Sequence, residues 1–157
     1  MKRVLLVLPL IACAACSGGS SSSSGASKAD YLQKAEAICT KANADQKALK
    51  TPTSAAQLSP YVDAVVQIAD TSTTALAALT PPKADAAALQ SHVLGPLTAQ
   101  LAKAKTYATE VRKASDAHDQ LGLAKLLSDP PNKTAADLDW MRKYGFQQCV
   151  DAADTSS

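Results

Sequence analysis

The apolar residues of this chain recur every three or four positions over long stretches, which is the period of one face of an α-helix. No window alternates apolar and polar residues as a half-buried strand does, so the pattern predicts an all-α fold. The clearest stripe is spaced alternately by four and three residues, as in a seam between packed helices, and consists of Leu58, Val62, Val65, Ala69, Ser72, Leu76 and Leu79.

Similar stripes and their interruptions divide the chain into four expected helices. The third keeps its stripe in phase across Gly95-Pro96, so we expect a kink there rather than an end. Gly145 is expected to end the fourth in a left-handed conformation, with Phe146 folded back onto the last turn. Short loops between amphipathic helices predict an antiparallel four-helix bundle with a kinked third and a broken fourth helix. The expected helices are 28–50, 54–79, 86–117 and the two pieces 120–127 and 135–144.

A recurring phrase marks the helix starts: a capping residue, two alanines, any residue and leucine. The oxygen of a Ser, Thr or Asp side chain accepts hydrogen bonds from the free amides of the first turn. Pro60 leaves two possibilities for the second helix: Ser59 caps it with Pro60 at the first position, or a short turn precedes a kink. The expected caps are Ser54, Asp85 and Thr134, with a looser copy at Ser27.

The N-terminal segment does not fit this helical domain. Lys2 and Arg3 precede the apolar run 4–12, which is far shorter than the roughly 20 residues that span a bilayer. A basic start, a short apolar run and a small-residue exit are the parts of a secretory signal. Because the exit ends in cysteine, the segment resembles bacterial lipoprotein precursors, in which a lipobox precedes a cysteine that is acylated and becomes the new N-terminus.

Two cysteines compete for the lipid. Leu10-Ile11-Ala12-Cys13 fits the usual lipobox better, but its signal would be short, whereas Cys16 gives a better length with Cys13 in the Leu position. The Ser/Gly-rich run that follows Cys16 is typical of a flexible tether. We therefore expect acylation at Cys16, with Cys13 as the alternative and an ordinary cleaved signal as a third possibility. The expected organisation is a signal peptide 1–15, a tether 16–26, a helical domain 27–149 and a disordered tail 150–157.

In an envelope protein the two remaining cysteines, Cys39 and Cys149, most simply form a disulfide. The bond would join the middle of the first helix to the chain just past the fourth. In the chain-entropy model a loop of this length contributes about 4 to 5 kcal/mol. Because alanine buries little apolar area, that contribution is comparable with the whole net stability of an Ala-rich domain. The alternative, two free thiols for redox or metal chemistry, has no neighbouring ligand motif.

The charge of the chain is close to balanced, with 16 Lys and Arg against 14 Asp and Glu. Removal of the signal takes away Lys2 and Arg3, so no basic surface for nucleic acid remains. One Phe, one Trp and many alanines are typical of a helical protein.

No catalytic, cofactor-binding or metal-binding site is expected. His92 has no Asp or Glu at the third or fourth position after it, and the Glu-x-x-His and Cys-x-x-Cys-His motifs are absent. His118 falls near the end of the third helix, where Asp119 is expected to cap the next. The cluster Trp140, Met141, Tyr144 and Phe146 is expected to close the core rather than to bind a ligand.

Two short motifs carry a second resemblance. Ala35-Glu36-Ala37-Ile38-Cys39 with Ala42-Asn43, and Tyr144-Gly145-Phe146-Gln-Gln-Cys149, resemble the start and finish of small exported, Ala-rich helical proteins of actinobacteria. The resemblance implies a framework of two cysteines and an envelope location, and it transfers no catalytic residue.

We expect a non-enzymatic lipoprotein on the outer face of the cytoplasmic membrane, whose helical domain presents a face to an envelope protein partner. Two or three acyl chains give stable attachment where one does not. The alternative is a small-molecule or lipid carrier with a cavity where the Gly95-Pro96 kink opens the helices. An enzyme ranks third. A large apolar cavity favours the carrier, and a solid core favours the interaction module.

Overall fold

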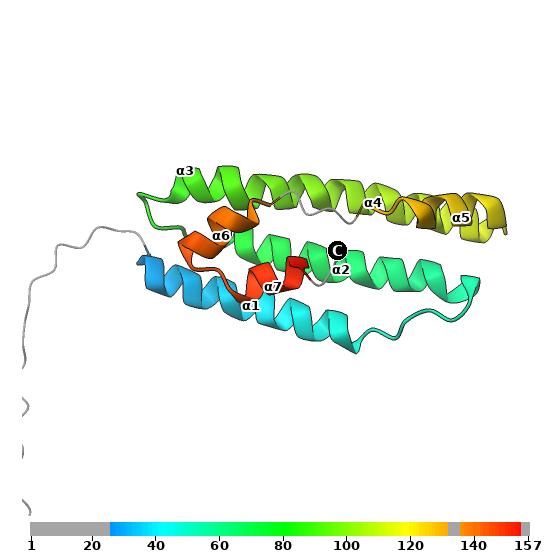
Figure 1. Ribbon diagram of the computed structural model, residues 1–157, viewed down its shortest axis with the longest axis horizontal. Coiled ribbons are helices and arrows are strands. Elements are labelled where there is room, and N and C mark those ends of the chain that lie inside the picture. The colour runs from blue at the N-terminus through cyan, green and yellow to red at the C-terminus, as the bar shows by residue number, and fades with distance from the viewer. Residues whose placement is uncertain (1–25, 132–135, 155–157) are drawn as a thin grey trace, which may run out of the picture.

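The structure is a computed structural model that describes residues 26–131 and 136–154. Within these residues the chain is helical and contains no strand, as predicted. Three long helices, α1 (Lys28–Ala48), α2 (Leu58–Ala77) and α4 (Gly95–Asp116), lie side by side, and each runs opposite to the one before it (Figure 1). The central helix, α2, packs against both of the others.

Two ion pairs link the outer faces of α2 and α4. The Arg112 guanidinium lies 2.6 Å from the carboxylate of Asp63, and the Lys105 ammonium lies 2.8 Å from that of Asp70. Seven residues separate the two partners on each helix, so both pairs lie along one edge of the contact. Exposed pairs of this kind contribute little stability each.

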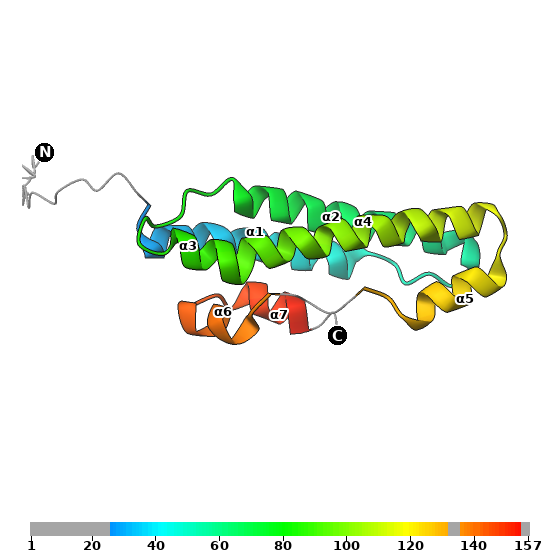
Figure 2. The same cartoon turned by 90° about the horizontal axis from the view of Figure 1, so that it is seen from above.

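Short helices cover one face of the three long ones (Figure 2). These are α5 (Gln120–Ser128), α6 (Leu138–Tyr144) and α7 (Gln148–Asp154). The fourth helix of the expected bundle is therefore divided into separate pieces. The helix α7 was not expected, because the tail was predicted to begin at residue 150. Val150 is instead buried in the core, where the disulfide at the preceding residue holds it.

The third helix changes its winding where a kink was expected. A short α3 (Ala86–Leu89) leads into the π-helical turn η2 (Gln90–Leu94), and α4 begins at Gly95. Pro96 has no N–H, so the regular hydrogen-bond ladder is interrupted there, and the chain passes through a π turn just before it. A Cβ atom at Gly95 would lie 2.9 Å from the carbonyl oxygen of Gln90, so this close turn requires glycine.

The expected caps are only partly correct. Ser27 caps α1 by accepting from the N–H of Asp30 at 3.1 Å, whereas Ser54 and Asp85 make no capping hydrogen bond. Thr134 lies outside the described residues, and the cap of α6 is Asp137, which accepts from the N–H of Trp140 at 2.9 Å. At the second helix a short 3-10 turn, η1 (Ala55–Gln57), precedes α2. Pro60 is the third residue of α2, in the first turn, where the helix uses no backbone N–H.

The C-terminal end of α6 is as predicted. Gly145 has a left-handed φ of 118°, and its N–H donates to the carbonyl of Met141 at 3.0 Å. The N–H of Phe146 donates to the same carbonyl at 3.0 Å, and the Phe146 ring is 1% exposed. This return turn brings the chain back over α1 before α7 begins.

The buried side chains form two clusters at opposite ends of the long helices. One surrounds the disulfide and contains Tyr31, Ala35, Cys39, Leu76, Leu89, Val93, Met141, Phe146, Cys149 and Val150. The other contains Leu58, Val111 and Leu123, near α5. A cavity lies between the two clusters.

Candidate functional site

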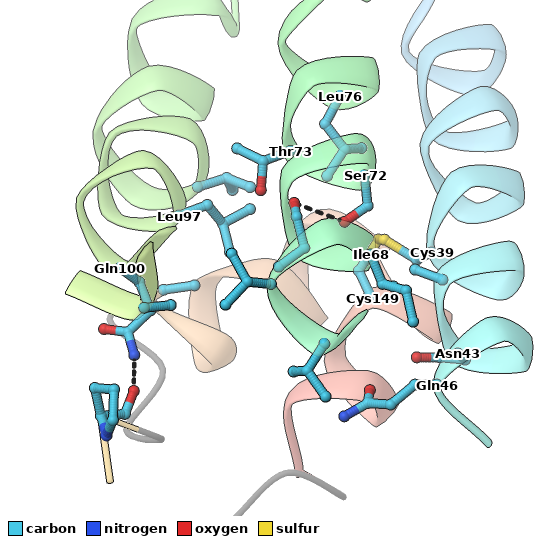
Figure 3. A pocket seen from close by; sticks show the side chains of 18 of the residues that line it. Cys39, Asn43, Gln46, Ile68, Ser72, Thr73, Leu76, Leu97, Gln100 and Cys149 are labelled. Carbon is cyan, nitrogen blue, oxygen red and sulfur yellow. Dashed lines mark hydrogen bonds between the residues drawn. A yellow bond between two sulfur atoms is a disulfide. The ribbon is translucent and has the colours of Figure 1, made fainter. Parts of the chain in front are cut away.

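The cavity has a volume of about 690 Å³, is partly open to solvent, and is bordered by α1, α2 and α4 together with the short helices (Figure 3). This volume falls inside the range of about 300–1,000 Å³ that is typical of small-molecule sites. Most of its lining is aliphatic or aromatic. The apolar lining includes Leu58, Val62, Val65, Val66, Ile68, Leu76, Val93, Leu97, Leu138, Met141 and Phe146.

Two features of the sequence leave this space open. The three long helices each place an alanine on its wall, at Ala42, Ala69 and Ala104, and a methyl group does not reach across a helix interface. The second feature is the division of the fourth helix. Between the end of α5 and the start of α6, the wall is formed by Pro130, Pro131 and Ala136 instead of by a helix.

The cavity wall carries no charged side chain among the residues that the structure describes. Its polar groups are amides and hydroxyls. On α2 the hydroxyl of Ser72 is already used, because it donates to the carbonyl of Ala69 at 3.1 Å. On α4 the Gln100 amide donates to the carbonyl of Pro131. The site therefore suits an uncharged molecule with a large apolar part.

Two tyrosines strengthen the neutral character of the wall. Burial raises the pKa of the Tyr31 and Tyr107 hydroxyls above the ordinary value for tyrosine. The Tyr107 hydroxyl donates to the carbonyl of Leu126 at 3.3 Å, which ties α4 to α5. Both phenols are therefore neutral at physiological pH.

Polar groups of α1 face the same space. Asn43 and Gln46 lie one helical turn apart, and both are half-buried. The Asn43 side-chain N–H donates to the carbonyl of Gln148 at 3.0 Å, so its amide oxygen is the group left for a ligand. The Gln46 amide has no hydrogen bond to any described residue, and Figure 3 shows it directed into the cavity.

The predicted disulfide is confirmed and forms part of the cavity wall. Cys39 on α1 is bonded to Cys149 on α7, with Cα atoms 4.9 Å apart. Glu36 reinforces the junction, because its carboxylate accepts from the N–H of Gln147 at 3.0 Å and of Gln148 at 2.6 Å. These contacts cap the first turn of α7 from outside the helix. The junction has three points of attachment from one face of α1, at Glu36, Cys39 and Asn43.

The aromatic cluster packs into one end of the core as a continuous stack. The expectation that it does not face a ligand site is correct only in part, because Met141 and Phe146 also line the cavity. His92 lies on Trp140 with ring centroids 4.9 Å apart, and Trp140 lies on Tyr144 at 4.8 Å. Tyr144 in turn stacks on Phe146 at 5.5 Å, whose ring meets the edge of Tyr31 at 6.4 Å. Burial and the hydrogen bond from the Tyr144 hydroxyl to Asp85 raise the pKa of Tyr144 above its ordinary value.

His92 has a partner that its sequence neighbourhood did not reveal. Its Nδ1 lies 3.1 Å from the carboxylate of Asp137, and its backbone carbonyl accepts from the N–H of Asp137 at 3.2 Å. The His92 carbonyl is available to Asp137 because Pro96, four residues later, has no N–H to donate to it within the helix. The Trp140 N–H, and then His92, lower the pKa of the Asp137 carboxyl. These contacts position α6 on η2, which is a structural role.

His118 is exposed and lies just past the end of α4, with a positive φ of 55°. The side chain of Asp119 caps α5 by accepting from the N–H of Gly122 at 2.8 Å, as predicted. No group of three or more His, Cys, Asp or Glu side chains gathers within residues 26–131 and 136–154 in a way that would hold a metal ion.

The predicted lipid attachment at Cys16, its alternative Cys13 and the tether up to residue 25 lie outside the described residues. None of the helices that the structure describes has the length and apolarity needed to cross a bilayer. Asn43 and Gln46 were not recognised as a pair from sequence. Their signal was the spacing of Cys39, Asn43 and Gln46, which places all three on one side of α1.

No protein-family model matches the chain, and neither a curated protein nor a solved structure was found to be significantly similar to it.

Proposed function

We propose that the protein is a carrier lipoprotein of the bacterial cell envelope, which holds a small, largely apolar molecule in the cavity between α1, α2 and α4. The observation that carries the proposal is the cavity of about 690 Å³ with its apolar wall. A partly open, apolar space of this size exposes hydrophobic side chains to water, and an apolar molecule bound there would cover them.

The composition of the wall supports binding rather than catalysis. Among the described residues, no His, Asp, Glu or Lys side chain lines the cavity, and these are the usual groups of acid–base catalysis. Tyrosine can also transfer protons, but burial raises the pKa of Tyr31 and Tyr107 and so disfavours their ionised form. The two cysteines on the wall are joined to each other and are not available as thiolate nucleophiles. The remaining groups bind and orient a ligand.

The N-terminal segment supports a location beside a source of apolar molecules. A lipobox ending in Cys16 and a Ser/Gly-rich tether would hold the helical domain within a short distance of the outer face of the cytoplasmic membrane. α1 begins directly after the tether, so the domain is attached at the end that carries the aromatic cluster.

An interaction module is the second candidate. It requires an exposed apolar face on the helices. The exposed large apolar side chains of the described residues are Leu121, at 85%, and Leu127, at 49%, and Leu127 also lines the cavity. Two exposed leucines, one of them on the cavity wall, do not form an apolar face, so the carrier is favoured.

A cavity-filling substitution tests the carrier. Ala69 lies in the middle of α2 on the cavity wall, and Ala69→Trp places an indole in the space. The matched control is Ala77→Trp, at the exposed end of the same helix. The full chain is purified from membranes of the producing cell, and co-purifying lipids are extracted and quantified by mass spectrometry against the protein.

We expect about one apolar molecule per chain from the wild type and the Ala77→Trp variant, and a loss of most of it from Ala69→Trp. Helical content and thermal unfolding of Ala69→Trp should stay close to wild type, because the indole occupies space that is already present. Equal recovery of lipid from all three proteins, or none from the wild type, would rule out the carrier.

A further inference from the structure

Asn43 and Gln46 give the α1 side of the cavity a polar patch. We propose that they bind an uncharged hydrogen-bonding group of the ligand, such as the hydroxyl or ester of a neutral acylglycerol, and that the cavity excludes ionised lipids. This inference rests on the proposed carrier function and adds the chemical class of its ligand.

The two amides are placed to act together. One helical turn separates them on α1, and both line the cavity. Asn43 is held by its hydrogen bond to the carbonyl of Gln148, which leaves its amide oxygen as an acceptor. Gln46 has both a donor and an acceptor available among the described residues. A hydroxyl can donate to Asn43 and accept from Gln46.

The remainder of the cavity fits the apolar body of such a ligand. From α1 the wall continues over α2, where most of the side chains that line the cavity are Val, Leu, Ile or Ala, with Tyr61, Ser72 and Thr73 among them. It ends against Val93, Met141 and Phe146, three side chains of the buried cluster around the disulfide. A molecule with one polar end and an acyl chain matches this arrangement.

The charges of α1 do not reach the cavity. Lys41 and Asp45 pair with each other at 2.6 Å and line a separate hollow of about 270 Å³ between α1 and α2. The carboxylate of Glu36 is occupied by the backbone of α7. An ionised carboxylate or ammonium beside Asn43 and Gln46 would therefore lose part of its hydration without meeting an opposite charge on the described wall, which is unfavourable.

Photolabelling of the full chain in isolated membranes at pH 8 tests the inference. The two probes are monopalmitoylglycerol and palmitate, each with a diazirine in the same position of the acyl chain. Labelling is quantified on the peptide that contains α2 and is normalised to bulk membrane protein. We expect at least about tenfold more labelling by monopalmitoylglycerol than by palmitate.

Three variants test whether Gln46 binds the polar group of the ligand. Gln46→Leu should reduce labelling by monopalmitoylglycerol about three- to tenfold, the effect of one lost hydrogen bond. Gln46→Lys should increase labelling by palmitate, because it supplies the missing counter-ion. This gain does not depend on the behaviour of the leucine variant. Gln33→Leu, at an exposed position of α1, is the matched control and should change neither signal.

The outcomes separate the two proposals. Equal labelling by both probes would overturn the neutral-ligand inference and leave the carrier standing. A preference for monopalmitoylglycerol that Gln46→Leu and Gln46→Lys leave unchanged would overturn the role of Gln46. Absence of labelling of α2 by both probes would overturn the carrier itself.

Discussion

Glu36 lies one helical turn before Cys39 on α1, and the two side chains hold the same short helix, α7. The carboxylate accepts from the backbone N–H groups of Gln147 and Gln148 at 3.0 and 2.6 Å, and Cys39 is bonded to Cys149. The disulfide fixes the distance between α1 and α7, and the carboxylate satisfies amides that the helix itself cannot. Together they place the C-terminal segment against the cavity.

Glu36→Gln should lower the free energy of unfolding by about 1 kcal/mol, because an amide can accept through one oxygen only and loses the charge that strengthens both hydrogen bonds. Glu110→Gln, at an exposed position of α4, makes the same chemical change without these contacts and should have little effect. Urea unfolding followed by circular dichroism measures both. Equal stability of the two variants would mean that Glu36 does not hold α7.

The disulfide should carry a large share of the stability. It closes a loop with a sequence separation of 110, so its removal by Cys39→Ala with Cys149→Ala should cost about 4 to 5 kcal/mol in the chain-entropy model. Reduction of the wild type should have the same effect on the thermal unfolding midpoint, and no effect on the double variant. A wild-type midpoint that does not change on reduction would contradict the prediction.

The chain should lose stability in alkaline solution. The pKa of Tyr144 is raised by burial and by its hydrogen bond to Asp85, so the neutral phenol is the form that the fold favours. This contribution is complete below about pH 10, the ordinary value for tyrosine, and is lost as the pH rises through the raised value. The raised pKa values of Tyr31 and Tyr107 act in the same direction.

Tyr144→Phe should therefore be less stable than wild type by about 1 kcal/mol at pH 7, through loss of the hydrogen bond, and should lose stability less steeply above pH 10. Unfolding in urea at several pH values between 7 and 11 measures both effects. Tyr61→Phe is the control, because the Tyr61 hydroxyl makes no hydrogen bond with the described residues. Parallel curves for wild type and Tyr144→Phe would contradict the role of Tyr144.

Gly95→Ala should destabilise the protein although alanine favours helices. The added Cβ would lie 2.9 Å from the carbonyl oxygen of Gln90, so the π turn must shift, at a cost of roughly 1 to 3 kcal/mol. The intrinsic preference for alanine offsets about 1 kcal/mol of this. Ala99→Gly, at an exposed position of α4, calibrates that preference. A variant more stable than wild type by the full helix preference would show that η2 tolerates a side chain.

Acylation should depend on Cys16. Metabolic labelling with an alkynyl palmitate analogue is expected to mark the wild type and the Cys13→Ser variant, and to be lost in Cys16→Ser. Fractionation should then release Cys16→Ser from the membrane, since no helix described by the structure spans a bilayer. Label that is retained in Cys16→Ser and lost in Cys13→Ser would move the acylation site to Cys13.

The sequence rules for helix caps and helix ends gave correct predictions where a feature depends on residues within one or two helical turns. The left-handed Gly145 with its folded-back Phe146, the cap at Ser27 and the cap at Asp119 are all as predicted, because each depends on contacts between near neighbours. The same rules failed at Asp85, whose carboxylate accepts from the distant hydroxyl of Tyr144 at 2.7 Å instead of capping α3. A stronger partner from another part of the chain replaced the local one.

The contacts that form the candidate site could not be predicted from residues that are neighbours in the sequence. The partner of His92 is Asp137, 45 residues away, and the partners of Glu36 are more than 100 residues away. Sequence periodicity shows which face of α1 is buried, but it does not show whether the opposite wall reaches that face. The sequence pattern places Ala69 in a packed seam, and only its convergence with Ala42 and Ala104 on one space makes these alanines a reason for the cavity.

The sequence by itself determined that this chain folds into helices, roughly where they begin and end, and which two cysteines are joined. These properties follow from the hydrophobic period, from capping chemistry and from the small number of cysteines. The tertiary structure decided that α7 exists, that Glu36 holds it and that a neutral cavity lies between the two buried clusters. Cavity volume depends on how side chains from several helices meet in space, and no single stretch of sequence contains that information.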